Sequence, residues 1–334
     1  MLITSPLRNP QRRAVLAAAG CVIASPAVLR AQQATFPNKP VRIILTVNPG
    51  NVGDTRARMI AEKLSPLLGQ PVIVENKAGA SGNIAADFVA KSPADGYTLL
   101  LGHTFNMTWN PHLLKMNFDP VKALTGVTKV SSGPPILVAH PSMPFNTVGE
   151  MITYAKANPG KLNMGGVTAG TAHVVLEMIK QKTGANITFV PYKAAGGQLT
   201  TDLIANVIQV YFDYTVTLAP FITAGRIKAL GVAANKRLTG ALPQIPTFAE
   251  SGYEGGLDVS SWQGFYAPTG TPPDILRRLA TETAKVLNLP EIKSSFELTG
   301  GDIGGDTPEQ FQAFTLTEFE RWGKVIKDAG IKLD

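Results

Sequence analysis

The chain alternates short β-rich runs with amphipathic stretches, and this alternation limits its possible folds more than any other feature. In the first third of the chain, the pattern predicts strands at 41–47, 71–75 and 97–101, with helices at 54–68 and 83–90 between them. Strands that alternate with helices form parallel sheets covered by helices. The sequence therefore predicts an α/β fold.

The same alternation continues in a second series. It predicts strands near 136–139, 162–164, 187–190, 208–212 and 227–232, separated by helices at about 147–157, 171–182, 197–205 and 216–224. The remainder is expected to be mainly helical, with helices at about 272–287 and 308–329 that begin near prolines. Two such series in 334 residues suggest two domains.

Two residues are expected to shape the helix at 54–68. Asp54 is interpreted as its N-cap, because a carboxylate accepts hydrogen bonds from the unpaired amides of a first turn, and a ligand contact is the alternative. Pro66 is expected to distort or end this helix, since proline lacks the backbone N–H.

Residues 1–31 have the features of an export signal peptide. Arginines at 8, 12 and 13 precede an apolar stretch at 14–24, and small residues follow it. This stretch is shorter than the roughly 20 residues that a spanning helix needs, so its hydrophobicity predicts no membrane anchor. Cleavage after Ala31 is expected. The Arg12-Arg13 pair fits a twin-arginine signal or an ordinary basic n-region equally well, so the export route stays open.

Cys21, in this leader, is the only cysteine of the sequence. The segment at 18–21 resembles an imperfect lipobox, which makes lipidation of Cys21 an alternative to cleavage after Ala31. Because the rest of the chain contains no cysteine, it has no disulfide, no thiol nucleophile and no cysteine metal site.

Charge and motifs exclude several classes of function. The net charge is +7, but four of the arginines lie in the leader, which argues against a polybasic protein that binds nucleic acid or membranes. The chain contains neither G-x-x-x-x-G-K-[ST] nor G-x-G-x-x-G, so a nucleotide is disfavoured. Its four histidines form no metal-binding motif, and no G-x-S-x-G elbow is complete. We expect no cofactor and no metal.

Three glycine-rich loops connect predicted strands to predicted helices, at 48–54, 76–83 and 165–173. Ligands of open parallel sheets bind at the carboxyl ends of the strands, where such loops lie. Each loop opens a helix whose unpaired amides attract an anion. Glycine-rich turns also serve simply as connections, so each loop alone is weak evidence for a site.

Many segments, in order along nearly the whole chain after the leader, resemble the Bug family, the periplasmic solute receptors of tripartite tricarboxylate transporters. They are 36–44 (FPNKPVRII), 69–83 (GQPVIVENKAGASGN), 93–102 (PADGYTLLLG), 157–163 (ANPGKLN), 190–193 (VPYK), 212–213 (FD), Trp262, 267–273 (APTGTPP) and 322–327 (WGKVIK).

This resemblance implies a two-lobed α/β fold of the type II periplasmic-binding-protein kind, with the ligand cleft between the lobes. Lobe one would contain 36–135 and 259–334, and lobe two 136–258. The protein would be a monomeric periplasmic receptor without catalytic activity that captures a small carboxylate, largely with backbone amides and water, for membrane permease subunits. The implied ligand-binding residues are Asn48, Pro49, Gly50, Asn51, Val52, Gly53, Asp54, His103, Thr104, Val167, Thr168, Ala169, Gly170, Thr171, Ala172, His173 and Asp213.

The first loop departs from the family pattern, Pro-Pro-Gly-Gly-Gly-Thr/Ser-Asp, because Asn51 and Val52 replace glycines. Asn51 could adopt a left-handed conformation, whereas a β-branched Val52 could not do so easily. Either the backbone differs here, or the glycines of relatives serve only through their small size. His103 also stands where relatives more often have threonine.

Two side chains and the function itself have alternative interpretations. His103 could donate to a ligand carboxylate or bond to the backbone, and Asp213 could contact the ligand or support its loop. The alternative function is a regulatory subunit that presents a ligand to a sensor kinase. An enzyme such as a hydrolase of a carboxylated substrate ranks third.

The leader predicts that the protein is exported, cleaved before about residue 35 and recovered in the periplasmic fraction. Mass spectrometry of fractionated cells measures this directly. Full-length protein retained in the cytoplasm would refute the prediction, and any membrane association due to lipidation should disappear in Cys21→Ser.

Overall fold

The computed structural model describes Met1 and residues 36–193, 197–238, 242–297, 301–328 and 330–331. The expected signal peptide, including Cys21, therefore lies outside the described residues. The chain divides into two units, Met1–Asn38 and Lys39–Asp334, and the described helices and strands belong to the second unit.

The first sheet has six strands among the described residues: β1 (Val41–Leu45), β2 (Val72–Asn76), β3 (Thr98–His103), β4 (Leu124–Gly133), β10 (Ser261–Pro268) and β11 (Asp302–Ile303). Their order across the sheet is β11-β4-β10-β3-β1-β2. β1 pairs in parallel with β2 and β3, as the alternation of strands and helices predicted. β10 runs antiparallel to both β3 and β4, so the sheet is mixed.

The second sheet has five strands in the described parts of the chain: β5 (Pro135–Ala139), β6 (Leu162–Val167), β7 (Ile187–Tyr192), β8 (Val210–Tyr214) and β9 (Lys228–Val232). Their order is β7-β6-β8-β5-β9. β6 is parallel to β7 and β8, whereas β5 is antiparallel to β8 and β9.

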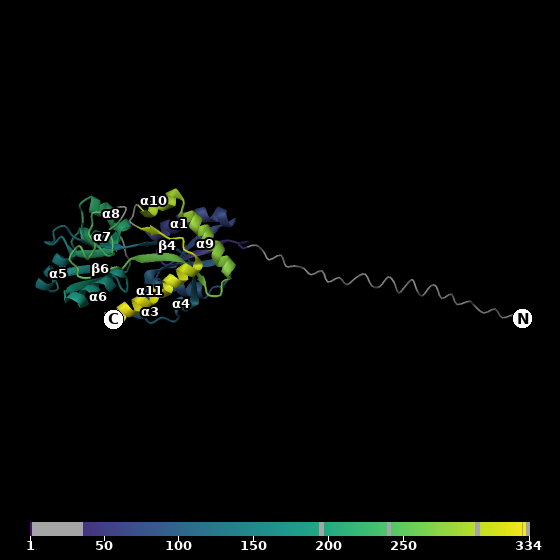
Figure 1. The fold of residues 1–334 in the computed structure, drawn as a ribbon, viewed down its shortest axis with the longest axis horizontal. Helices are drawn as coiled ribbons and strands as arrows, with labels where there is room; N and C mark the ends of the chain where they lie inside the picture. The colour runs from purple at the N-terminus through teal and green to yellow at the C-terminus, as the bar shows by residue number, and fades with distance from the viewer. Residues whose placement is uncertain (2–35, 194–196, 239–241, 298–300, 329, 332–334) are drawn as a thin grey trace. The chain divides into compact units, whose positions relative to one another are not determined.

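Helices accompany both sheets, and α5, α6, α7 and α8 lie around β6 in Figure 1. The helical segments are α1 (Val52–Leu68), η2 (Ala80–Gly82), α2 (Asn83–Ala90), η3 (Phe105–Trp109), α3 (Asn110–Leu113), α4 (Pro120–Ala123), α5 (Val148–Ala157), α6 (Thr171–Thr183), α7 (Gly197–Ile204), α8 (Thr215–Thr223), α9 (Pro273–Leu287), α10 (Pro290–Glu297) and α11 (Pro308–Asp328). No helix among the described residues is long and apolar enough to span a membrane.

The structure confirms the α/β fold with two sheets and corrects the expected content of two segments. The ten-residue strand β4 was missed, and the C-terminal part contains β10 as well as helices. Each strand contains a glycine, Gly126 in β4 and Gly264 in β10, and a residue without a side chain interrupts the alternation of apolar and polar side chains that marks a strand. Their pairing depends on partners far away in the sequence, which local patterns do not reveal.

Of the two effects expected of Pro66, that it ends the helix is wrong, because α1 continues to Leu68, where the pattern predicted its end. The helix ends at Gly69, which has a left-handed backbone (φ 71°) and donates its N–H to the carbonyl of Ser65. Ser65 Oγ in turn accepts a hydrogen bond from the N–H of Val72, at the start of β2. A glycine C-cap of this kind, rather than the proline, sets the boundary.

Two apolar clusters show how the sheets are packed. In the first sheet, Trp262 and Tyr266 of β10 pack with Phe311 of α11. A second cluster combines the second-sheet helices and strands with Trp322 and Ile326 from the C-terminal half of α11. Thus α11 contributes to the cores of both sheets. The lobe boundaries expected from the sequence stay a prediction.

Gly264→Ala is predicted to destabilise the first sheet. A Cβ at this position would lie 2.3 Å from Cζ of buried Phe311 and 2.8 Å from the carbonyl oxygen of Thr128. Overpacking of this kind costs about 1–3 kcal/mol, which thermal unfolding would report as a lower Tm. Gly197→Ala is the matched control, since nothing lies within 4 Å of its Cβ position. Equal Tm values for the two variants would contradict the prediction.

Candidate functional site

The first glycine-rich loop joins β1 to α1 and differs from its expected form. Asn51, not Asp54, is the N-cap of α1: its backbone is extended (φ −68°, ψ 155°), and its side chain accepts a hydrogen bond from the N–H of Gly53 at 2.8 Å. Val52 is the first helical residue, and of this loop only Gly50 has a positive φ, 80°. The loop therefore needs no glycine at 51 or 52 for its conformation. Asn48 and Pro49 are exposed.

Asp54 is buried in the first turn of α1 and supports the loop. Its carboxylate accepts hydrogen bonds from Gly50 N (2.9 Å) and from Asn76 Nδ2 (3.0 Å), and it forms an ion pair with Arg58 (2.9 Å). The Arg58 hydrogen bond is the main reason that the Asp54 pKa falls to about 2. With its oxygen atoms occupied in this way, Asp54 holds the loop to α1 and β2 rather than presenting a free carboxylate.

The second loop, between β2 and α2, has a strained backbone. Four successive residues have positive φ, and two of them, Ala80 (46°) and Ser81 (52°), are not glycine. Such conformations cluster at functional sites, where surrounding contacts enforce them. Asn110 provides one such contact, because its Nδ2 donates to the carbonyl of Ser81 at 2.9 Å. The Oγ of Ser81 donates to the carbonyl of Thr168 at 3.4 Å, which brings the second loop to the third.

The third loop follows β6 and opens α6. Ala169 has a positive φ of 61°, and Gly170 is the extended N-cap (φ −84°, ψ 175°), whose N–H donates to the carbonyl of Val167 at 2.9 Å. No side chain caps this helix. The amides of Thr171, Ala172 and His173, in the first turn, therefore have no helical acceptor. Gly170 itself does not offer a free amide, although it was among the predicted ligand-binding residues.

His173 shapes this loop from one turn further along α6. Its Nδ1 accepts a hydrogen bond from the N–H of Ala169 at 3.4 Å, and its ring stacks on Phe189 with centroids 3.8 Å apart. Burial lowers the His173 pKa, so the ring is neutral.

His103 ends β3 with a buried, unpaired ring nitrogen. The backbone N–H of His103 donates to Asn106 Oδ1 at 2.7 Å, and the His103 ring stacks on Phe105 with centroids 5.1 Å apart. Burial lowers its pKa to about 4. Nε2 has no hydrogen-bond partner.

Two further buried polar atoms near His103 lack partners: Oγ1 of Thr46, which follows β1, and Nδ2 of Asn106. Both residues border Gly82 of the second loop, where a Cβ would lie 3.1 Å from Thr46 Cβ and 3.3 Å from Asn106 Cβ. Buried polar groups are normally hydrogen-bonded, and unpaired ones indicate a functional role or a missing partner. Sequence reasoning missed Asn106 because it lies in a π-helix, which no local pattern announced.

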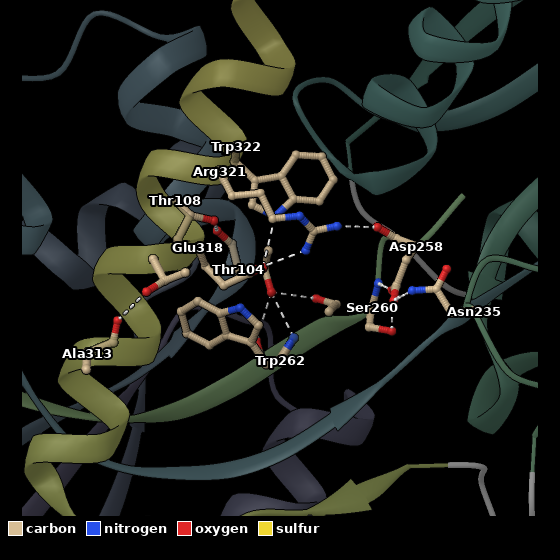
Figure 2. Close-up of polar contacts among 12 residues, drawn as sticks. Thr104, Thr108, Asn235, Asp258, Ser260, Trp262, Ala313, Glu318, Arg321 and Trp322 are labelled. Carbon is tan, nitrogen blue, oxygen red and sulfur yellow. Dashed lines mark hydrogen bonds and ion pairs between the residues drawn. The ribbon is translucent and has the colours of Figure 1, made fainter. Parts of the chain in front are cut away.

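Thr104 is completely buried at a junction between β3 and β10. Its Oγ1 accepts hydrogen bonds from Trp262 N (2.8 Å) and Ser261 Oγ (3.2 Å). Figure 2 shows these contacts beside a second network, in which Arg321 of α11 donates to the carbonyl of Asp258 at 2.7 Å. Asp258 lies in the segment that joins β9 to β10. The hydroxyl of Thr104 thus has protein partners, and we interpret Thr104 as support for this junction.

Contacts at the end of β8 connect α6 with the same junction. The hydroxyl of Tyr214 lies 3.2 Å from Thr171 Oγ1 and also hydrogen-bonds to Ser261. Asp213 accepts hydrogen bonds from Tyr211 OH (2.5 Å) and Tyr214 N (2.8 Å), and burial raises its pKa. These bonds favour the interpretation of Asp213 as loop support. Tyr214 was missed because a lone tyrosine after a strand carries no signal.

The structure thus brings the second loop to the third, which opens α6, and places His103 beside Asn106, which borders Gly82 of the second loop. Among the described residues, no group of three or more His, Cys, Asp or Glu side chains could hold a metal. A groove of about 840 Å³ lies elsewhere, along α5 and Tyr253, and none of the predicted site residues lines it.

Comparisons with known proteins agree with this fold. The family model described as tripartite tricarboxylate transporter family receptor matches residues 56–331. The protein BugT of Bordetella pertussis is 33% identical over 324 residues, which cover 96% of this chain and 98% of BugT. The solved structure of R. palustris Rpa4515 with adipate has a TM-score of 0.81 and 34% identity, and covers 89% of this chain and 99% of that chain.

A second solved structure, MatC from Rhodopseudomonas palustris with bound malate, has a TM-score of 0.79 and 26% identity, over 87% of this chain and 100% of that chain. The family model spans well over half of the sequence, and BugT is similar over almost its whole length. The chain therefore belongs to the tripartite tricarboxylate transporter receptor family, of which Bug proteins are members.

Proposed function

We propose that this protein is a monomeric periplasmic receptor that binds a small organic carboxylate between its two sheets and delivers it to the membrane permease subunits of a tripartite transporter. The observation that carries the proposal is the uncapped N-terminus of α6, where the amides of Thr171, Ala172 and His173 have no helical acceptor. An anion at such a position gains hydrogen bonds and a favourable dipole interaction. Adipate and malate in the two solved relatives support a carboxylate as the ligand.

Contacts between elements of the two sheets support a ligand position between them. Ser81, which follows β2, contacts Thr168, which follows β6. Tyr214, at the end of β8, contacts both Thr171 of α6 and Ser261 of β10. A carboxylate at the start of α6 would therefore be close to groups from both sheets. Closure of the sheets around it is the expected motion of a two-lobed receptor.

The sheet composition supports the proposed lobe boundaries. Strands of the first sheet come from 41–133 and 261–303, and those of the second from 135–232. These ranges agree with a lobe one of 36–135 plus 259–334 and a lobe two of 136–258. The C-terminal half of α11 is the exception, since Trp322 and Ile326 pack with the second sheet. We propose that α11 braces the two lobes.

Thr171→Pro is predicted to weaken carboxylate binding at least tenfold relative to Thr171→Ala, a difference of about 1.4 kcal/mol. Both variants remove the hydroxyl that contacts Tyr214, but only proline removes the amide. The backbone tolerates proline here, because this is the first helical position and Gly170 before it is extended. Titration calorimetry with the tightest binder from a thermal-shift screen of C4 to C6 carboxylates measures the difference.

Lys193→Ala, which removes an exposed cation near β7, is the second comparison. It should cost less than Thr171→Pro. Binding lost in Lys193→Ala but retained in Thr171→Pro would show that a side-chain ion pair holds the ligand, and the helix-terminus mechanism would be wrong. All variants should be compared at equal unliganded Tm.

His103→Gln is predicted to reduce the loss of stability in acid. Burial lowers the pKa of His103 in the folded protein to about 4, whereas in the unfolded chain the pKa of this histidine has its ordinary value of 6.5. The unfolded state therefore binds more protons between these values, so stability falls as the pH decreases from about 6.5 to about 4, by roughly 3 kcal/mol at most.

Urea unfolding at pH 7.5, 5.5 and 4.5 measures this effect, with His140→Gln as the control for loss of one histidine. If His103→Gln loses as much unfolding free energy between pH 7.5 and 4.5 as the wild type, His103 is not a buried neutral ring. It would then be removed from the proposed set of neutral donors.

A further inference from the structure

The N-termini of α1 and α6 differ in whether side chains of the protein accept hydrogen bonds from the backbone amides there. At α1, Asn51 Oδ1 accepts from Gly53 N at 2.8 Å, and Asp54 Oδ2 accepts from Gly50 N at 2.9 Å. At α6, no side chain caps the helix. The amides of Thr171, Ala172 and His173 are thus open to a ligand carboxylate at α6, whereas at α1 the amide of Gly53 becomes available only when Asn51 is displaced.

The unpaired buried atoms beside the first loop are uncharged. Thr46 Oγ1 and Asn106 Nδ2 have no partner in residues that are 6% and 0% exposed, and Nε2 of His103 is also unpaired. His103 pairs across the sheet with Gln263, whose Oε1 lies 4.0 Å from the Cβ position of Gly53. Gln263 thus lies between His103 and the loop that Asn51 caps, and Thr46 precedes this loop in the sequence.

Neutral hydrogen-bonding groups suit an amide or a hydroxyl better than a second carboxylate. An anion brought to this side of the site would lose its hydration, and the buried partners available to it carry no charge. The carboxylate of Asp54 is already paired with Arg58, and the family pattern also has an aspartate at this position. Asn51 and Val52 both differ from the family pattern, and of the two only Asn51 has a side chain that bonds an amide of α1.

We propose that this receptor selects ligands with a single carboxylate, bound at α6, and an uncharged polar group at the other end, and that Asn51 sets this selectivity. The inference rests on the proposed function. Asn51 competes with a second carboxylate for the amide of Gly53, and Thr46, His103 and Asn106 receive the uncharged group.

Adipate and its half-amide, adipamate, form the matched pair of probes, since they share length and shape and differ by one charge. Titration calorimetry at pH 7 and low salt should show adipamate binding at least fivefold more tightly than adipate. In Asn51→Gly, which frees the amide of Gly53, this ratio should fall at least fivefold through tighter binding of adipate. Succinate and succinamate repeat the test at a shorter length.

Thr147→Ala is the matched control, because Thr147 caps α5 through Glu150 N at 3.1 Å, as Asn51 caps α1. It should lower stability by a similar amount and leave the ratio unchanged. Adipate and succinate binding as tightly as their half-amides, or an unchanged ratio in Asn51→Gly, would overturn this inference and leave the proposed function standing. No binding of any of the four probes at millimolar concentration would contradict the proposed function itself.

Discussion

The proposed binding of a carboxylate depends on the uncapped N-terminus of α6. A helix leaves its first amides without acceptors, and most helices satisfy them with a side-chain cap. α6 begins instead at Gly170, which has no side chain, after the left-handed Ala169. Its first-turn amides therefore need an external acceptor. In the proposed function a ligand carboxylate supplies one without requiring a buried cation, whose desolvation would be costly.

Close packing around β6 holds this helix end in place. A Cβ on Gly165 would lie 2.5 Å from Leu199 Cδ2, and one on Gly166 would lie 2.8 Å from Ala172 Cβ. The two glycines thus let α6 and α7 approach the strand closely. Tyr214 and Ser261 then connect the start of α6 to the first sheet. The proposed binding site and the contacts between the sheets therefore depend on the same few residues.

Much of the fold was predictable because it is local, and the errors arose where it is not. The alternating pattern predicted β1, α1 and β6 close to their observed bounds. It missed β10, whose pairing with β3 and β4 joins segments more than 100 residues apart. At α1, Asn51 and Asp54 are both good caps, and only the backbone geometry shows that Asn51 is used. The unpaired atoms of Thr46 and Asn106 come from separate elements, so no sequence spacing could bring them together.

A crystal structure with the tightest carboxylate ligand bound tests the central claim most directly. We expect both carboxylate oxygens within about 3.2 Å of backbone nitrogens in the first turn of α6, with Asn51 still bonded to the N–H of Gly53. A carboxylate paired with a lysine or arginine side chain away from α6 would contradict the claim that an uncapped helix end is the anion site.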